Sequence, residues 1–178
     1  MDDSDVITAA QERFRRDNSA WSDVFDKARD DLHFLSDDEF AQWDRKDAEA
    51  RTTTGRPAIT IDQLNQFVHQ VANDSRMNTP TINVIPGDKD SSIETANVYK
   101  GLIKNIEYVS NADDAYDTAG LNAIKCSLGF IRVDHDYVDE ETFDQQLLIK
   151  RITNPLSVLL DCDSVECDGR DAKHATII

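Results

Sequence analysis

The chain of 178 residues is poor in basic residues and in glycine. Its 19 Lys and Arg stand against 35 Asp and Glu, which gives a formal net charge of −16. Because binding to phosphates needs clustered Lys and Arg, this balance argues against a surface that holds nucleic acid tightly. Six glycines, with no glycine-rich phosphate loop among them, argue in the same way against a nucleotide site.

Long apolar runs and a disulfide framework are also missing. No stretch approaches the ~20 apolar residues of a membrane span, and no basic–apolar–small signal peptide opens the chain. The three cysteines, Cys126, Cys162 and Cys167, are an odd number with no recognisable disulfide spacing. The sequence therefore predicts no membrane association and a reducing, cytoplasmic site of synthesis.

The first part of the chain is acidic and has helical periodicity. We expect a short helix over 4–16 and a clearer one over 19–35. A polar block from Arg45 to Pro57 follows, and it ends in a loop over 52–57. Residues 1–50 are predicted to be a helical segment and residues 51–178 an α+β domain. The apolar positions of the clearer helix are Trp21, Val24, Phe25, Ala28 and Leu32.

Two capping-box spacings predict later helix starts. They are Thr60 with Gln63, ahead of a helix over 61–78, and Ser91 with Glu94, ahead of a helix over 93–109. A third helix over 112–127 has alanines at close-packing intervals.

Alternating apolar residues predict strands. They are expected at 81–85, 129–137, 147–149 and 157–160, with a last strand within 173–178. The fold class is thus α+β, with N-terminal amphipathic helices followed by mainly antiparallel strands. The core is expected to contain Phe67, Val71, Ile103, Ile106 and Val133. Because the last strand ends on two isoleucines, we expect a chain truncated at its C-terminal end.

The acidic loop Asp161–Asp171 is a candidate cation site. Counted from Asp161 as a calcium loop, it has Val165, Glu166 and Ala172 where an oxygen ligand, Gly and Glu are needed, so the EF-hand motif fails. Cys162, Cys167 and His174 offer three zinc ligands without a fourth at a recognisable spacing. The prediction is an acidic turn without a metal, and the alternative is a small metal- or calcium-binding protein.

Catalytic patterns are weak. His135 lies between Asp134 and Asp136, but in a strand both carboxylates point to the opposite face from the histidine. His33 and His69 stand alone, and the Gly55-Arg56-Pro57 turn is a weak candidate for an anion at the following helix N-terminus. The sequence predicts no catalytic, cofactor-binding or metal residues, and a protein that is not an enzyme.

The order of several segments is more informative than any one motif. They are Ala28-Arg29-Asp30-Asp31-Leu32, Gln42-Trp43-Asp44, Gly55-Arg56-Pro57-Ala58-Ile59, Val71-Ala72-Asn73-Asp74-Ser75, Ala112-Asp113-Asp114-Ala115-Tyr116, Gly129-Phe130-Ile131-Arg132-Val133, Asn154-Pro155-Leu156-Ser157-Val158 and Asp168-Gly169-Arg170-Asp171-Ala172. This succession resembles the portal proteins of short-tailed phages and related prophages, over nearly the whole chain.

The resemblance implies a non-catalytic subunit of a homo-oligomeric ring at one capsid vertex. Such a ring forms the DNA passage for packaging and ejection and connects head to tail. The implied partners are further copies of the chain and capsid, scaffold, terminase and tail proteins. The implied location is the virion, with assembly in the host cytoplasm, and this chain corresponds to the N-terminal part of the subunit.

Overall fold

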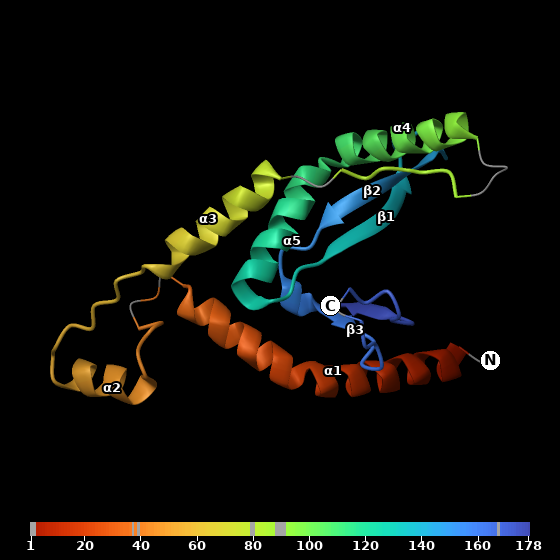
Figure 1. The fold of residues 1–178 in the computed structure, drawn as a ribbon. Helices are drawn as coiled ribbons and strands as arrows, with labels where there is room; N and C mark the ends of the chain where they lie inside the picture. The colour runs from red at the N-terminus through yellow and green to blue at the C-terminus, as the bar shows by residue number, and fades with distance from the viewer. Residues whose placement is uncertain (1–2, 37, 39, 79–80, 88–91, 167) are drawn as a thin grey trace. The chain divides into compact units, whose positions relative to one another are not determined.

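A computed structural model of the chain describes residues 3–36, 38, 40–78, 81–87, 92–166 and 168–178. Within these residues five α-helices come first and two small antiparallel sheets follow (Figure 1). This order confirms the predicted α+β class, with helices N-terminal and strands C-terminal. No described helix is both long and apolar enough to cross a membrane.

The chain divides into two compact units that interleave in sequence. Unit 1 comprises residues 1–65, 125–128 and 154–178, and unit 2 comprises residues 66–124 and 129–153. The predicted boundary between residues 50 and 51 separates two segments that were expected to be distinct domains. It stays a prediction.

Helix α1, Asp3–Phe34, is the longest element of unit 1. The two helices expected over 4–16 and 19–35 are one, because no glycine or proline occurs before residue 55 to interrupt the backbone ladder. Phe25 and Ala28 are buried, and the Trp21 indole nitrogen donates to the carbonyl of Leu160 at 3.0 Å.

The C-terminal strands complete unit 1. Strand β3, Val158–Leu160, pairs antiparallel with β4, Ala175–Ile177, and α1 packs on β3. The 3-10 turn η1, Pro155–Ser157, leads into β3, and Leu159 is completely buried. The strands predicted in these two regions are confirmed.

The polar block from Arg45 contains helix α2, Arg45–Thr53, which was not predicted and which includes the first two residues of the loop expected over 52–57. Composition hid it, because none of its residues is buried and it has no apolar stripe. Local contacts form it instead: Asp44 caps its N-terminus by accepting from the Lys46 N–H, and the Arg51 guanidinium lies 4.3 Å from the centre of the Trp43 ring. Gly55 has φ +65°, and residues 56–60 after it are irregular, whereas residues 61–63, expected to be helical, are irregular as well.

The predicted helices of the middle region are present with shifted starts. Helix α3 is Leu64–Met77, and the Asp62 carboxylate, in place of the expected Thr60, accepts from the Leu64 and Asn65 N–H groups. Helix α4, Ile93–Ser110, is capped by Ser92, whereas the expected Ser91 lies outside the described residues. Helix α5, Ala112–Cys126, agrees with its prediction.

Strand β1, Ile131–Tyr137, pairs antiparallel with β2, Gln145–Arg151, and α4 packs on β2. The strand expected at 81–85 is wrong. Residues 81–87 are irregular. The Asn83 side chain accepts a hydrogen bond from Lys100 on α4 at 2.9 Å, so this segment contacts a helix and does not join a sheet.

The predicted core is partly wrong. Phe67, Val71 and Val133 are 55%, 53% and 65% exposed, whereas Ile103 and Ile106 are half-buried. Small residues explain the difference, because close packing through alanines turns the larger neighbours on the same helix outward. The buried residues of the helices in unit 2 are Val68, Ala72, Ala96, Ala112 and Ala115.

Candidate functional site

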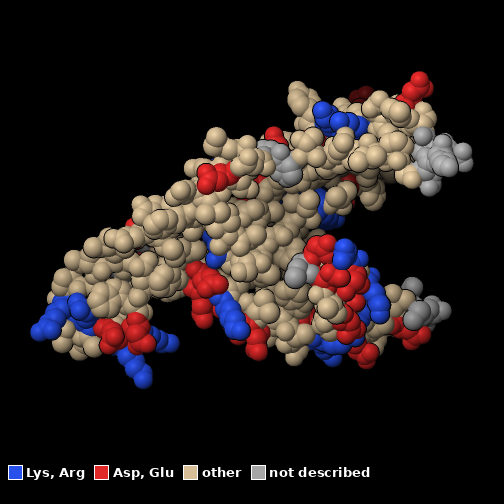
Figure 2. All heavy atoms as spheres, in the orientation of Figure 1, with Lys and Arg blue, Asp and Glu red and all other residues tan. Residues whose placement is uncertain are grey.

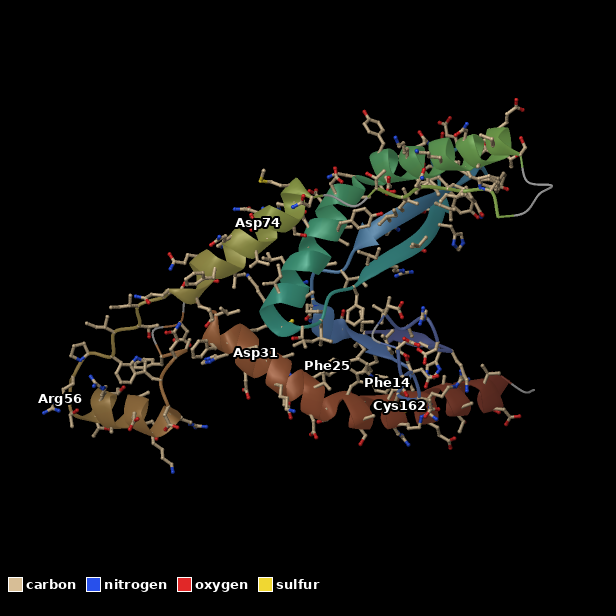
Figure 3. The ribbon with its side chains drawn as sticks, viewed as in Figure 1. Phe14, Phe25, Asp31, Arg56, Asp74 and Cys162 are labelled. Carbon is tan, nitrogen blue, oxygen red and sulfur yellow. The ribbon has the colours of Figure 1, made fainter. Side chains whose placement is uncertain are left out.

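The densest group of interacting charged side chains in unit 1 joins α1 to the loop between β3 and β4. We call it the carboxylate cluster, and it consists of Arg16, Asp17, Asp161, Cys162 and His174. The side chains of Asp17 and Asp161 are 0% and 2% exposed. Figure 3 shows Cys162 against α1, close to Phe14.

Asp17 is the centre of the cluster. Its Oδ2 lies 2.7 Å from His174 Nε2, and its Oδ1 accepts from the Cys162 N–H at 3.3 Å. The Arg16 guanidinium, on the same helix, lies 3.6 Å from Asp17 and 3.2 Å from Asp161. A buried carboxylate is stable only with such partners, so these bonds fix α1 on the loop.

Asp161 holds the loop itself. Its two carboxylate oxygens accept from the N–H groups of Asp163 at 3.1 Å and of Lys173 at 3.3 Å, and its own N–H donates to the His174 carbonyl at 3.1 Å. Both arms of the loop are therefore tied to one side chain, directly after strand β3.

The pKa values follow from these contacts. Burial alone raises the pKa of Asp17, but the hydrogen bonds from His174 and Cys162 outweigh it, so the pKa lies below its ordinary value. The backbone N–H of Asp163 is the largest cause of a lowered pKa at Asp161. Burial, with Asp17 beside it, raises the pKa of the Cys162 thiol, which keeps the sulfur protonated at neutral pH.

These directions predict acid sensitivity. A carboxylate with a native pKa below its unfolded value of about 3.9 contributes stability above that pH and loses it as pH falls through the native value. We expect the urea midpoint of unfolding to fall between about pH 5 and pH 2.5, and to fall less steeply in Asp17→Asn. Equal slopes for the two proteins would contradict the role given to Asp17.

A cation is the alternative use of the same atoms. Ligand atoms of Asp17, Asp161 and Cys162 all lie within 4.8 Å of one another, and His174 contacts both carboxylates. Arg16 already supplies a positive charge there, and every fully buried side-chain nitrogen or oxygen among the described residues has a hydrogen-bond partner. This arrangement favours an internal ion-pair cluster, because the carboxylates already have a positively charged partner and hydrogen-bond donors.

The metal-binding alternative also named Cys167 and the far end of the acidic loop. Cys167 lies outside the described residues. The Asp171 carboxylate accepts from Ser164 Oγ at 2.6 Å and from the Val165 N–H at 2.8 Å, so it closes the acidic turn by itself. The absence of a metal site stays a prediction.

The Asp134-His135-Asp136 pattern has a structural explanation. Both carboxylates lie within 3.3 Å of Lys150 on β2, and their other oxygens accept from the N–H groups of His135 and Tyr137, each at 3.0 Å. Capping N–H groups in this way protects a strand edge from pairing with another chain.

The remaining candidates are surface residues. His33 lies 3.8 Å from Asp38 with both side chains more than half exposed, and His69 is exposed. Arg56 points outward from its turn (Figure 3), and the helix that was expected to follow closely begins only at Leu64. The turn is therefore not at a helix N-terminus.

Sequence reasoning missed Asp17, although a signal for it exists. Phe14, Asp17, Trp21, Phe25 and Ala28 recur at intervals of three and four residues, which puts an acid within the apolar stripe of α1. An acid at such a position needs a partner from elsewhere in the chain, and the sequence does not say where. The cluster as a whole connects segments that are far apart in the sequence.

Comparison with known proteins identifies the family. The family model described as phage P22-like portal protein matches residues 11–178, nearly the whole chain. No curated protein matches the chain. The chain belongs to the phage P22-like portal protein family. This family is structural, so membership supports a portal role in an oligomeric assembly of a bacteriophage particle, with capsid and tail proteins as partners in general.

Proposed function

We propose that the chain is part of the subunit of a closed ring of identical copies at one vertex of a phage capsid. The ring forms the passage through which DNA enters during packaging and leaves during ejection, and the tail joins it. The observation that carries this proposal is the family match over residues 11–178. Scaffold, terminase and tail proteins are the proposed partners, and the gene is that of a phage or prophage.

The charge of the chain supports this role. A passage must let DNA slide, and a chain of net charge −16 does not hold phosphates. Both units are acidic: the Lys and Arg count minus the Asp and Glu count is −9 for unit 1 and −7 for unit 2, which sum to −16. On this proposal the protein performs no catalysis, and assembly takes place in the host cytoplasm before the ring becomes part of the virion.

Antibody labelling of particles tests the position at one vertex. Gold-labelled antibodies against the chain are expected to mark purified tailless particles at a single vertex in electron micrographs, because one ring occupies one vertex. Antibodies against the major capsid protein serve as the control, with labels over the whole shell. Label against this chain distributed over the whole shell would contradict the proposal. The absence of label on the particles would contradict it as well.

A further inference from the structure

The segment before α4 has the residues of a strand but no strand beside it. Residues 81–85 alternate in polarity and include four β-branched side chains, a composition that favours strands. No backbone N–H or C=O group of residues 81–87 bonds to the backbone of another described residue. Ile82 and Ile85 are 46% and 75% exposed. In a single copy of the chain, this segment therefore lacks the partner edge that a strand requires.

Three of the four strands have their outer edges bonded by side chains of the same chain. Two aspartates accept from N–H groups of β1, as described above. On β2, the Ile149 N–H donates to Ser110 Oγ at 3.0 Å. On β3, the Leu160 carbonyl accepts from the Trp21 indole. Contacts of this kind protect a sheet edge from pairing with another chain.

Strand β4 differs, because its outer edge is open. The His174 carbonyl and the Ile178 N–H bond towards β3. Since the backbone groups of successive residues point to opposite sides of a strand, those of Ala175 and Ile177 point away from β3. No hydrogen bond joins them to another described residue, and both residues are exposed. An edge of this kind is a template for one more strand.

Both segments are free of charge. Residues 81–87 and 175–178 contain no Asp, Glu, Lys or Arg, although 30% of the residues of the chain are charged. Figure 1 shows residues 81–87 beside α4, and in Figure 2 the same part of the surface consists mainly of uncharged atoms. Two copies of a −16 chain repel each other over most of their surfaces, so uncharged segments are where copies approach at least cost.

We propose that residues 81–85 of one copy of the chain pair with the open edge of β4 in a second copy. The added strand offers N–H and C=O groups to those of Ala175 and Ile177, the usual basis of strand addition between chains. Within one copy β4 pairs only with β3, and residues 81–87 join no sheet, so each segment takes its partner from another copy. A third strand also stabilises a two-stranded sheet, which is marginal by itself.

The contact joins two different patches of the chain. One end of a pair of copies keeps an unpaired 81–85 segment and the other keeps an open β4 edge. The contact therefore repeats from copy to copy and closes into a ring when the rotation permits. This inference rests on the proposed function, because it requires several copies in one assembly.

Photo-crosslinking in assembled particles tests the contact. Ile85 is replaced with the photoreactive p-benzoylphenylalanine in the protein as made from its own gene, and purified particles are irradiated. We expect a product of twice the subunit mass, with residue 85 linked to residues 174–178 of another copy. Ile61 is the matched control, because it is also an isoleucine of an irregular segment and is 73% exposed. Its replacement is expected to give no link to residues 174–178.

The possible failures are distinguishable. A link from residue 85 to residues 174–178 of the same copy, to another segment or to another protein overturns the pairing, and so does the absence of any product. The proposed function still stands in these cases if particles of the unsubstituted protein have a single labelled vertex. It fails if that label is absent or spread over the shell.

Proline at position 177 provides a second measurement. Ile177→Pro removes an N–H group that points away from β3, the position at which an edge strand tolerates proline. We expect the urea midpoint of the purified chain to stay unchanged. The yield of particles with a labelled vertex is expected to fall by at least about tenfold, because each contact between copies loses a hydrogen bond.

Ile177→Val is the matched control, because valine keeps the N–H group. Its yield is expected to stay within about twofold of that of the unsubstituted protein. An unchanged yield with Ile177→Pro, or an equal fall with Ile177→Val, overturns the inference. A lowered urea midpoint of Ile177→Pro overturns it as well, because the N–H group would then be bonded within one copy.

Discussion

Replacing Asp17 with alanine is expected to lower the free energy of unfolding by about 3–5 kcal/mol, the usual effect of removing one partner from a buried ion pair. Asp17 is completely buried, and its loss leaves His174 Nε2 and the Cys162 N–H without the acceptor that each contacts. Arg16 and Asp161 would keep their contact at 3.2 Å. Urea unfolding, followed by circular dichroism, measures the effect.

Asp23→Ala is the matched control for this experiment. Asp23 is exposed on the same helix, so the variant has the same change in charge and in helix propensity without the buried contacts. Its effect is expected within about 0.5 kcal/mol. A loss below about 1 kcal/mol for Asp17→Ala would show that the cluster does not hold α1 in place.

Gly129→Ala is expected to destabilise unit 2 by about 3 kcal/mol, at the upper end of overpacking effects. An added Cβ would overlap the backbone carbonyl oxygen of Ala119 on α5 and lie 2.9 Å from its carbonyl carbon. Backbone atoms cannot rotate away as a side chain does, so the chain entering β1 would have to move off α5. Thermal unfolding followed by circular dichroism measures this loss.

The control lies on another helix of the same unit. Gly101 is in the middle of α4, and nothing lies within 4 Å of the position of an added Cβ. Gly101→Ala is therefore expected to stabilise the chain by about 0.5–1 kcal/mol, because alanine loses less backbone entropy in a helix. A shift of stability in the same direction for both substitutions would contradict the close approach of residue 129 to α5.

The sequence predicted elements well where periodicity was strong. The stripe containing Val68 and Ala72 located α3, and the alternation from Ile131 located β1. Helix α2 was missed because it depends on a cap and on Arg51 stacking over Trp43, which leave no apolar period. A local pattern identifies the apolar residues of a helix, but not which of them are buried. Phe67 and Val71 were therefore wrongly placed in the core.

The candidate site was harder to predict than the fold. The acids of the 161–171 loop could be recognised in the sequence. Their partners Arg16 and Asp17 belong to a helix much earlier in the chain, and 145 residues separate Arg16 from Asp161. Spacing rules describe ligands that are close in sequence. A buried pair assembled from both ends of the chain follows only from the tertiary packing of β3 on α1.

The separation in sequence between Asp17 and His174 also determines how long α1 waits for its partner during synthesis. A ribosome adds about 5–20 residues per second, so the first helix emerges roughly 8–30 seconds before the histidine that completes its cluster is made. Residues 66–124 and 129–153 of unit 2 are complete earlier. During this interval the Trp21 indole lacks its acceptor, the Leu160 carbonyl, and the side of α1 that packs on β3 is exposed in the nascent chain.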